Sequence, residues 1–294
     1  MLRQFLVLAA LVAGVILLGA LLCWPVWLVF SHQAAGHFNR IQTFCTLFAG
    51  LILCLLYLRT SGATFRDNLG YRGAARVLPG LVSKSFVIGF AVIALLEALY
   101  LSLGVRHVNA NADTSAAALA LLALKALLAG VLVALLEETL FRGALQGALQ
   151  RRINAPAAVL LSSVIFAAAH YLKYPEPHAG AITWSTGIAL LPQALRWFKL
   201  PGIIPSLTAL FLLGVLLALS RWRRGNIYEC IGFHAGLVSA LKIRSYLTGF
   251  TPGARFDFLA GRYSSDLGWP AIVLLAALIV VYLRGGRGNA CSDS

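Results

Sequence analysis

Long uninterrupted apolar stretches constrain most strongly what this 294-residue chain can fold into. Several of them are about 18–25 residues long, which is the length an α-helix needs to cross the hydrocarbon core of a bilayer. The chain is 60% hydrophobic and only 12% charged, and a soluble domain carries roughly twice that share of charge. We therefore expect an all-α, polytopic transmembrane helix bundle with no separate soluble domain.

The hydropathy pattern predicts about eight membrane helices. The expected ranges are residues 5–30, 41–58, 81–104, 116–149, 156–173, 203–220, 227–247 and 269–284. The first stretch is too long for a signal peptide and lacks a convincing small-residue cleavage site, so it is kept as a membrane helix. Segment 174–202 is broken by prolines and carries Trp184 and Trp197. Tryptophans concentrate at headgroup level, so this segment is predicted to be interfacial or re-entrant.

The net charge of +14 comes from basic residues at the ends of the apolar stretches. They lie in the loop after the second helix and behind the fourth, sixth and eighth helices: Arg59, Arg66, Arg72, Arg76, Lys84, Arg151, Arg152, Arg221, Arg223, Arg224, Arg284 and Arg287. These positions share one side of a membrane if the chain crosses eight times. The positive-inside rule then predicts N-in, C-in topology. We expect a multi-pass protein of the bacterial inner (plasma) membrane, with the lipid bilayer as a partner and no nucleic-acid binding.

We divide the chain into three segments of one membrane domain. Residues 1–115 hold the first helices and the basic loop, residues 116–250 are the expected core, and residues 251–294 hold the last helix and a short tail. None of the five cysteines belongs to a CxxC pair. We therefore predict no disulfide framework and no thiolate metal site, and interpret the cysteines as small buried hydrophobes.

Two adjacent carboxylates, Glu137 and Glu138, lie inside the fourth apolar stretch. Each costs roughly 2.5–3.5 kcal/mol at membrane depth, so such residues usually carry chemistry, transport or an important ion pair. Arg142 lies four residues after Glu138 and therefore shares its helix face. This spacing predicts a structural Glu138–Arg142 ion pair and leaves Glu137, on a different face, to act as a base.

The next helix supplies a partner at the same depth. Helices four and five form a hairpin about residue 153, and Glu137 and His170 are almost equally far from it along the chain. At about 1.5 Å per residue, both lie roughly 25 Å from the turn, so we expect them to meet. Phe166 lies one turn before His170 on the same face.

His234, in the seventh helix, is the third polar group of this expected site. The small residues Gly232, Ala235 and Gly236 beside it allow neighbouring helices to approach closely. Its depth matches that of His170 only approximately. One carboxylate and two imidazoles from three helices are a suitable set for activating a water molecule.

These motifs resemble the CPBP family, which includes the type II CAAX prenyl proteases and bacteriocin-processing or self-immunity proteins. Glu137, Glu138 and Arg142 match its Glu-Glu-x-x-x-Arg motif, and Phe166 and His170 match its Phe-x-x-x-His motif. His234 matches the start of a third motif, in which an Asn follows four residues later. Here that position is Val238. The segment Asn68–Arg72 also looks like the one that precedes the core in many members.

The resemblance implies an intramembrane endopeptidase acting on a membrane-embedded or lipidated protein, such as a prenylated CAAX-like or C-terminally sorted substrate. It implies that Glu137 and His170 activate water and that His234 stabilises the oxyanion. The neighbouring Ser239 is a poor substitute for the missing Asn, because it points about 100° away. We expect no cofactor. Zinc is possible because of the same family's metalloprotease interpretation, and Glu137, His170 and His234 would then be its ligands.

Two other functions remain open from the sequence. The departure at Val238 is compatible with an inactive membrane binding or bacteriocin-immunity protein of the same fold. Glu137 and His170 could also relay protons in a transporter, although the chain has no duplicated halves. Elsewhere, Glu97 and Lys125 lie at similar depth on either side of the loop near residue 110, which predicts a structural ion pair between them.

Overall fold

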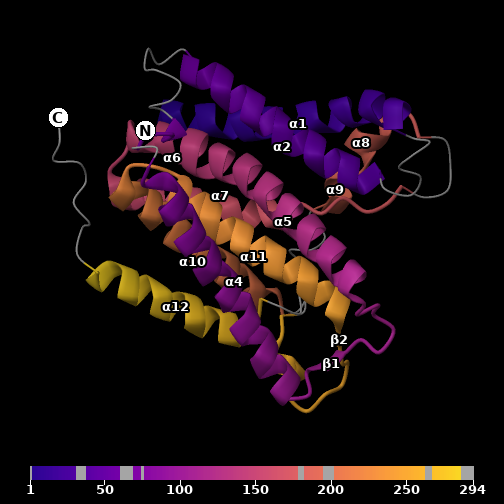
Figure 1. Cartoon of the computed structure of the whole chain (residues 1–294). Coiled ribbons are helices and arrows are strands. Elements are labelled where there is room, and N and C mark those ends of the chain that lie inside the picture. Colours follow the sequence, from indigo (N-terminus) through magenta and orange to yellow (C-terminus); the bar gives the residue numbers. More distant parts are fainter. Residues whose placement is uncertain are drawn as a thin grey trace. The chain divides into compact units, whose positions relative to one another are not determined.

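A computed structural model describes residues 2–30, 38–59, 69–73, 76–177, 182–194, 202–261 and 267–285, shown in Figure 1. Each of the predicted apolar segments is a helix, with ends within a few residues of those expected. The chain divides into two compact units. Unit 1 comprises Met1–Phe65 and Ala168–Leu200, and unit 2 comprises Arg66–Ala167 and Pro201–Ser294.

Unit 1 is built on two long helices, α1 (Leu2–Phe30) and α2 (Phe38–Arg59), which pack along each other. Two short helices follow later in the chain, α8 (Thr186–Ala189) and α9 (Leu191–Ala194), and α8 packs against α1. The predicted interfacial segment is thus partly helical. Trp184 is exposed there, whereas Trp197 lies outside the described residues.

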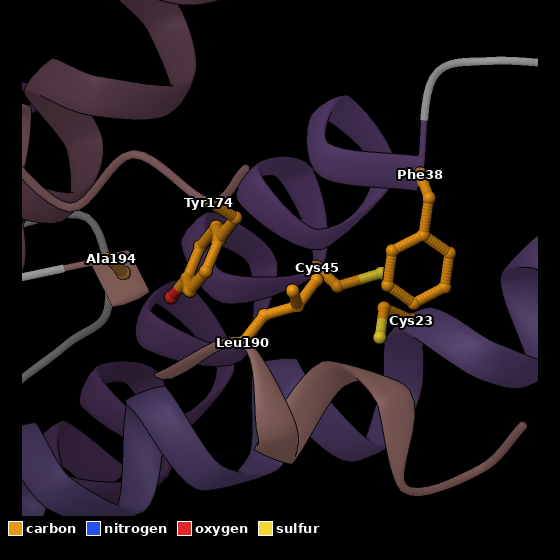
Figure 2. Packing of buried hydrophobic residues seen from close by; sticks show 6 residues of the cluster. All are labelled: Cys23, Phe38, Cys45, Tyr174, Leu190 and Ala194. Carbon is orange, nitrogen blue, oxygen red and sulfur yellow. The ribbon is translucent and has the colours of Figure 1, made fainter. Parts of the chain in front are cut away.

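A small apolar core holds unit 1 together, as Figure 2 shows. It contains Cys23, Phe38, Cys45, Tyr174, Leu190 and Ala194. The Tyr174 hydroxyl shares a hydrogen bond of 3.2 Å with Thr46 Oγ1, so its one polar atom is satisfied. Cys23, Cys45 and the unit 2 residue Cys230 are buried free thiols, which confirms the hydrophobic role predicted for these three cysteines.

Unit 2 contains the remaining elements. In chain order they are α4 (Leu78–Ser102), β1 (Arg106–Val108), α5 (Ala116–Glu138), the π-helix η1 (Thr139–Leu145), α6 (Gln146–Gln150), α7 (Ala155–His170, whose last three residues belong to unit 1), α10 (Ile203–Arg224), α11 (Tyr228–Leu247), β2 (Thr248–Phe250), the 3₁₀ turn η3 (Asp257–Leu259) and α12 (Trp269–Arg284). The strands β1 and β2 pair antiparallel, with Arg106 opposite Phe250. The sequence did not predict this ribbon or η1.

Helix α11 packs between α4 and α5 through glycines. A Cβ on Gly236 would come 2.1 Å from the Phe86 carbonyl oxygen of α4, and one on Gly130 would come 2.6 Å from the Ala235 carbonyl oxygen. The small residues around His234 therefore permit close helix packing, as predicted. Because α11 carries His234, these contacts also place the imidazole deep between its neighbours.

This packing predicts the effect of adding one methyl group. We expect Gly236→Ala to lower the free energy of unfolding by about 1–3 kcal/mol, because its Cβ would overlap a backbone oxygen that cannot rotate away. The matched control is Gly80→Ala in α4, where nothing lies within 4 Å of the added Cβ. That control should be neutral or stabilising by up to about 1 kcal/mol, since alanine favours helix more than glycine. Thermal unfolding in detergent measures both, and equal effects would contradict the close approach.

Four helical stretches of the described residues are long and apolar enough to cross a membrane: Ala13–Phe30, Leu78–Ser102, Ala116–Gln150 and Ile203–Arg224. Three shorter apolar helices cover Phe38–Leu53, Ala155–His170 and Trp269–Arg284. Large apolar side chains are exposed on several of these helices, among them Leu95, Leu128 and Val273. An exterior of this kind suits lipid and not water, and the chain is a helical integral membrane protein.

Candidate active site

The two adjacent carboxylates lie at the end of α5, where the helix changes its geometry. Glu138 is the last residue of α5. The π-helix η1 follows without a break, so the hydrogen bonding changes from the α to the wider π pattern directly after Glu138. Such π segments occur frequently at functional sites. The side chain of Glu138 is completely buried, and that of Glu137 is 14% exposed. The two neighbours therefore differ in access to the surroundings.

Glu138 is held by two cationic or polar partners. Its Oε2 lies 3.4 Å from Arg142 Nε, which is the predicted ion pair four residues along the helix. Its Oε1 lies 2.7 Å from Nδ1 of His234 on α11. This second contact was not predicted. It links the Glu-Glu-x-x-x-Arg motif directly to the third motif and fixes the orientation of the imidazole ring.

Glu137 faces the opposite nitrogen of the same imidazole. Its Oε2 lies 3.9 Å from His234 Nε2, which is too long for a direct hydrogen bond. The ring of His234 therefore lies between the two carboxylates, bonded to Glu138 and facing Glu137. Since the His234 side chain is only 6% exposed, this group of charges is largely shielded from water.

Arg142 compensates the buried charge and is itself enclosed. Its Cζ lies 4.3 Å from the centre of the Phe166 ring and 6.0 Å from that of Phe141, which are distances for cation–π attraction. Its Nη2 donates to the Gly214 carbonyl of α10 over 3.4 Å, and one turn later Gln146 Nε2 donates to Ala218 over 2.9 Å. The region from η1 to α6 is thereby fixed along α10.

Phe166, the first residue of the second motif, is fully buried beside this group. Its ring meets Phe141 edge-on at 5.2 Å between centroids and His234 at 6.3 Å. It therefore packs against both the guanidinium and the imidazole. His170 is the last residue of α7 and belongs to unit 1. The predicted approach of His170 to Glu137 stays a prediction.

Tyr71 lies near the site, a position that the sequence does not predict, although the segment Asn68–Arg72 resembles the one that precedes the core in the family. Its hydroxyl forms a 2.5 Å hydrogen bond with Thr139 Oγ1, directly after the two carboxylates. Burial raises the pKa of Tyr71, and the Glu138 charge acts in the same direction. The phenol therefore stays protonated at neutral pH and contributes a hydrogen bond to the start of η1.

The two residues considered for the missing amide behave differently. Val238 is half-buried and carries no polar atom. Ser239 is buried, and its hydroxyl donates to the Ala126 carbonyl of α5 over 3.2 Å. Ser239 therefore stabilises the contact between α11 and α5, in line with the expectation that it is a poor substitute.

The predicted Glu97–Lys125 ion pair is wrong. Glu97 Oε1 lies 3.1 Å from Arg106 Nε, and Oε2 lies 3.9 Å from Arg244 Nη1. The loop after α4 folds back as β1 and brings Arg106 nearer than any group on α5. Lys125 is exposed on the surface of α5. An estimate of depth along two helices could not reveal this ribbon.

A cavity of about 160 Å³ lies between α4, α10, α11 and α12. It is separate from the site formed by Glu137, Glu138 and His234, none of which lines it. Phe233 lines it, whereas the neighbouring His234 does not. At its polar end, Glu229 Oε2 accepts hydrogen bonds from Ser220 at 2.8 Å, Tyr282 at 3.0 Å and Arg224 at 3.2 Å. These bonds tie the ends of three helices together, which gives Glu229 a structural role.

Among the residues that the structure describes, no group of three or more His, Cys, Asp or Glu side chains is arranged to hold a metal ion. Within unit 2, His234 Nδ1 is already hydrogen-bonded to Glu138. Only Nε2 of that ring faces Glu137. A carboxylate behind the imidazole fixes its tautomer and orientation, both for proton transfer and for metal ligation through Nε2.

Part of the chain is similar to a known protein family. No curated protein and no solved structure matches the chain. The family model described as type II CAAX prenyl endopeptidase Rce1-like matches residues 119–239. The matched segment begins in α5 and ends in α11, so it includes all the motif residues: Glu137, Glu138, Arg142, Phe166, His170 and His234. Over these residues, the chain is similar to the type II CAAX prenyl endopeptidase Rce1-like family.

Proposed function

We propose that this protein is an intramembrane endopeptidase that hydrolyses a peptide bond in a membrane-embedded or lipidated protein. The observation that carries the proposal is the arrangement of His234 between Glu137 and Glu138 inside the segment that matches the endopeptidase family. A prenylated, CAAX-like substrate suits both the family and the apolar surroundings. The match supports a protease ahead of an immunity protein or a proton-coupled transporter.

In the proposed mechanism, Glu137 is the general base and His234 stabilises the developing negative charge. A water molecule about 2.8 Å from each atom fits between Glu137 Oε2 and His234 Nε2, which are 3.9 Å apart. Glu137 takes a proton from this water as its oxygen attacks the scissile carbonyl carbon. His170 assists by orienting the water. The proton then passes to the leaving amine, which restores Glu137.

Charge balance gives His234 its role in this mechanism. Two carboxylates and one guanidinium leave a single negative charge in the buried group. A protonated imidazole would neutralise it, and its Nε2–H could then donate to the oxyanion. Glu138 acts as a positioning residue, because its Oε1 accepts a hydrogen bond from Nδ1–H and fixes the orientation of the ring. Arg142 in turn offsets the charge of Glu138.

The first test is a cleavage assay on candidate membrane substrates. We expect Glu137→Ala and His170→Ala each to lower kcat by about 10²–10⁴-fold, the usual contribution of a positioned acid or base. The controls are Glu176→Ala and His107→Ala, which remove exposed residues of the same types. Processing that is unchanged in both Glu137→Ala and His170→Ala would rule out the protease assignment.

The same assay tests metal dependence. We propose a metal-free glutamate–histidine mechanism, so activity should persist after prolonged treatment with a strong chelator at neutral pH. Complete loss of activity that added zinc restores would instead establish a metalloprotease. In that case Glu137, His170 and His234 would be the first residues to examine as ligands.

We also propose the topology that the basic loops predict, with eight crossings and both termini on the cytoplasmic side of a bacterial plasma membrane. The seven apolar stretches support part of this count. Helix α11 is the remaining crossing, although it carries Glu229, Lys242 and Arg244. Because α11 is packed between α4 and α5, Glu229 and Arg244 need not face lipid, whereas Lys242 is exposed near the end of the helix. The three-segment division, with a core at 116–250, is kept in this proposal.

A further inference from the structure

Arg221, near the end of α10, is a buried cation that lacks a counter-ion within the described part of the chain. It is only 8% exposed, and its Nε is fully buried without a hydrogen-bond partner. The two arginines that follow it in the chain, by contrast, both have partners. Arg223 donates to the carbonyl oxygens of Leu283 and Gly285, and Arg224 pairs with Glu229. A buried charge without a partner lowers stability, so the retention of Arg221 requires an explanation that the proposed proteolytic site does not give.

A second arginine lies beside it. Arg72 is exposed, and its charge repels that of Arg221. Gly70 makes this approach possible, since a Cβ there would come 2.6 Å from Arg221 Cζ. Gly70 also has a φ of 77°, a conformation that favours glycine. Its carbonyl accepts the amide of Ile227, which fixes the turn over the guanidinium. The backbone turn at Gly70 therefore keeps the positive charges of Arg72 and Arg221 near each other.

The depth of Arg221 and Arg72 in the membrane indicates which kind of anion can bind to them. Arg221 lies in the last turn of an apolar helix that is long enough to cross a bilayer. The adjacent Trp222 is 38% exposed, and exposed tryptophans concentrate at the membrane–water interface. Lipid phosphates lie at the same level. Basic pockets between membrane helices bind anionic headgroups for this reason.

We propose that Arg221 and Arg72 form a binding site for the phosphodiester headgroup of an anionic membrane phospholipid. The planar guanidinium of Arg221 offers parallel N–H donors to two phosphate oxygens. Arg72 adds a second positive charge from the exposed side. The bound lipid supplies the missing counter-ion and fixes the turn of Leu69–Gly73 against α10. The site does not depend on proteolysis, so it can be tested on the protein without a substrate.

The experiment titrates the full-length protein in detergent with phosphatidylglycerol or phosphatidylcholine and follows thermal unfolding. We expect phosphatidylglycerol to raise Tm more than phosphatidylcholine does. Arg72→Gln should weaken the apparent affinity for phosphatidylglycerol by about tenfold, as loss of a hydrogen bond to a charged group does. Arg221→Lys should weaken it as well, because it keeps the charge but loses the paired donors. The control Arg76→Gln removes an exposed charge near the same turn and should bind like the wild type.

Phosphatidylglycerol binding that is unchanged in Arg72→Gln and Arg221→Lys would overturn the proposal. If Arg221→Lys does not fold, Arg72→Gln decides alone, since its side chain is exposed. A further arm adds inorganic phosphate without lipid. Stabilisation by millimolar phosphate equal to that by the lipid would assign the site to a soluble anion and overturn the lipid assignment. No effect of free phosphate, together with the lipid effect, supports it.

Discussion

Replacement of His234 by alanine is expected to lower kcat by about 10²–10³-fold and to leave KM within a few-fold of the wild type. The reason is the position of the ring. Nδ1 is bonded to Glu138 at 2.7 Å, so Nε2 is directed toward Glu137, 3.9 Å away, where the reacting water is proposed to lie. A donor at that place acts on charge that develops only in the transition state. Its loss therefore appears in kcat.

The control is His107→Ala, which removes an exposed imidazole on β1 and should leave kcat unchanged. A companion variant, Glu138→Gln, separates positioning from catalysis. It keeps a carbonyl acceptor for Nδ1–H but removes the negative charge, so it should lower kcat less than His234→Ala does. If His234→Ala raised KM with kcat unchanged, the imidazole would be a substrate-binding group and the proposed role would be wrong.

Much of the fold could be predicted because a membrane imposes one requirement throughout. A helix must be about 20 apolar residues long to cross, and apolar stretches of this kind are visible in the sequence without further knowledge. The pairing of Glu138 with Arg142 could be predicted for a similar reason, since it depends only on spacing within one helix. Both predictions rest on local information.

The rest depended on contacts between distant segments. The bond from His234 to Glu138 joins α11 to α5, and no periodicity encodes which neighbour a helix residue meets. The glycines around His234 indicated close packing but not the partner. Glu97 was assigned to Lys125 by depth alone, whereas the ribbon of β1 and β2 brought Arg106 to it. Strands of three residues leave too little pattern to be recognised.

The second large effect concerns stability and not turnover. We expect Arg142→Met to lower the free energy of unfolding by about 3–5 kcal/mol, the cost of leaving a buried charge without its partner. Glu138 is completely buried, and Arg142 lies 3.4 Å from it. The variant also loses the cation–π contact with Phe166 and the bond to Gly214. The control is Arg152→Met, since that arginine is exposed after α6, and it should change stability by less than about 0.5 kcal/mol.

A double variant determines how much of this loss is electrostatic. In Glu138→Gln/Arg142→Met both charges of this ion pair are removed, so neither is left without its partner. We expect this protein to be more stable than Arg142→Met alone, because a neutral amide is far less costly to bury than a carboxylate. Thermal unfolding of the wild type, Glu138→Gln, Arg142→Met and the double variant completes the double-mutant cycle. If the two substitutions were simply additive, the pair would contribute no coupling energy, and Arg142 would be stabilising the bundle through Phe166 and α10. A favourable interaction between the substitutions would show instead that the arginine is retained to hold the charge of Glu138, and with it the orientation of His234.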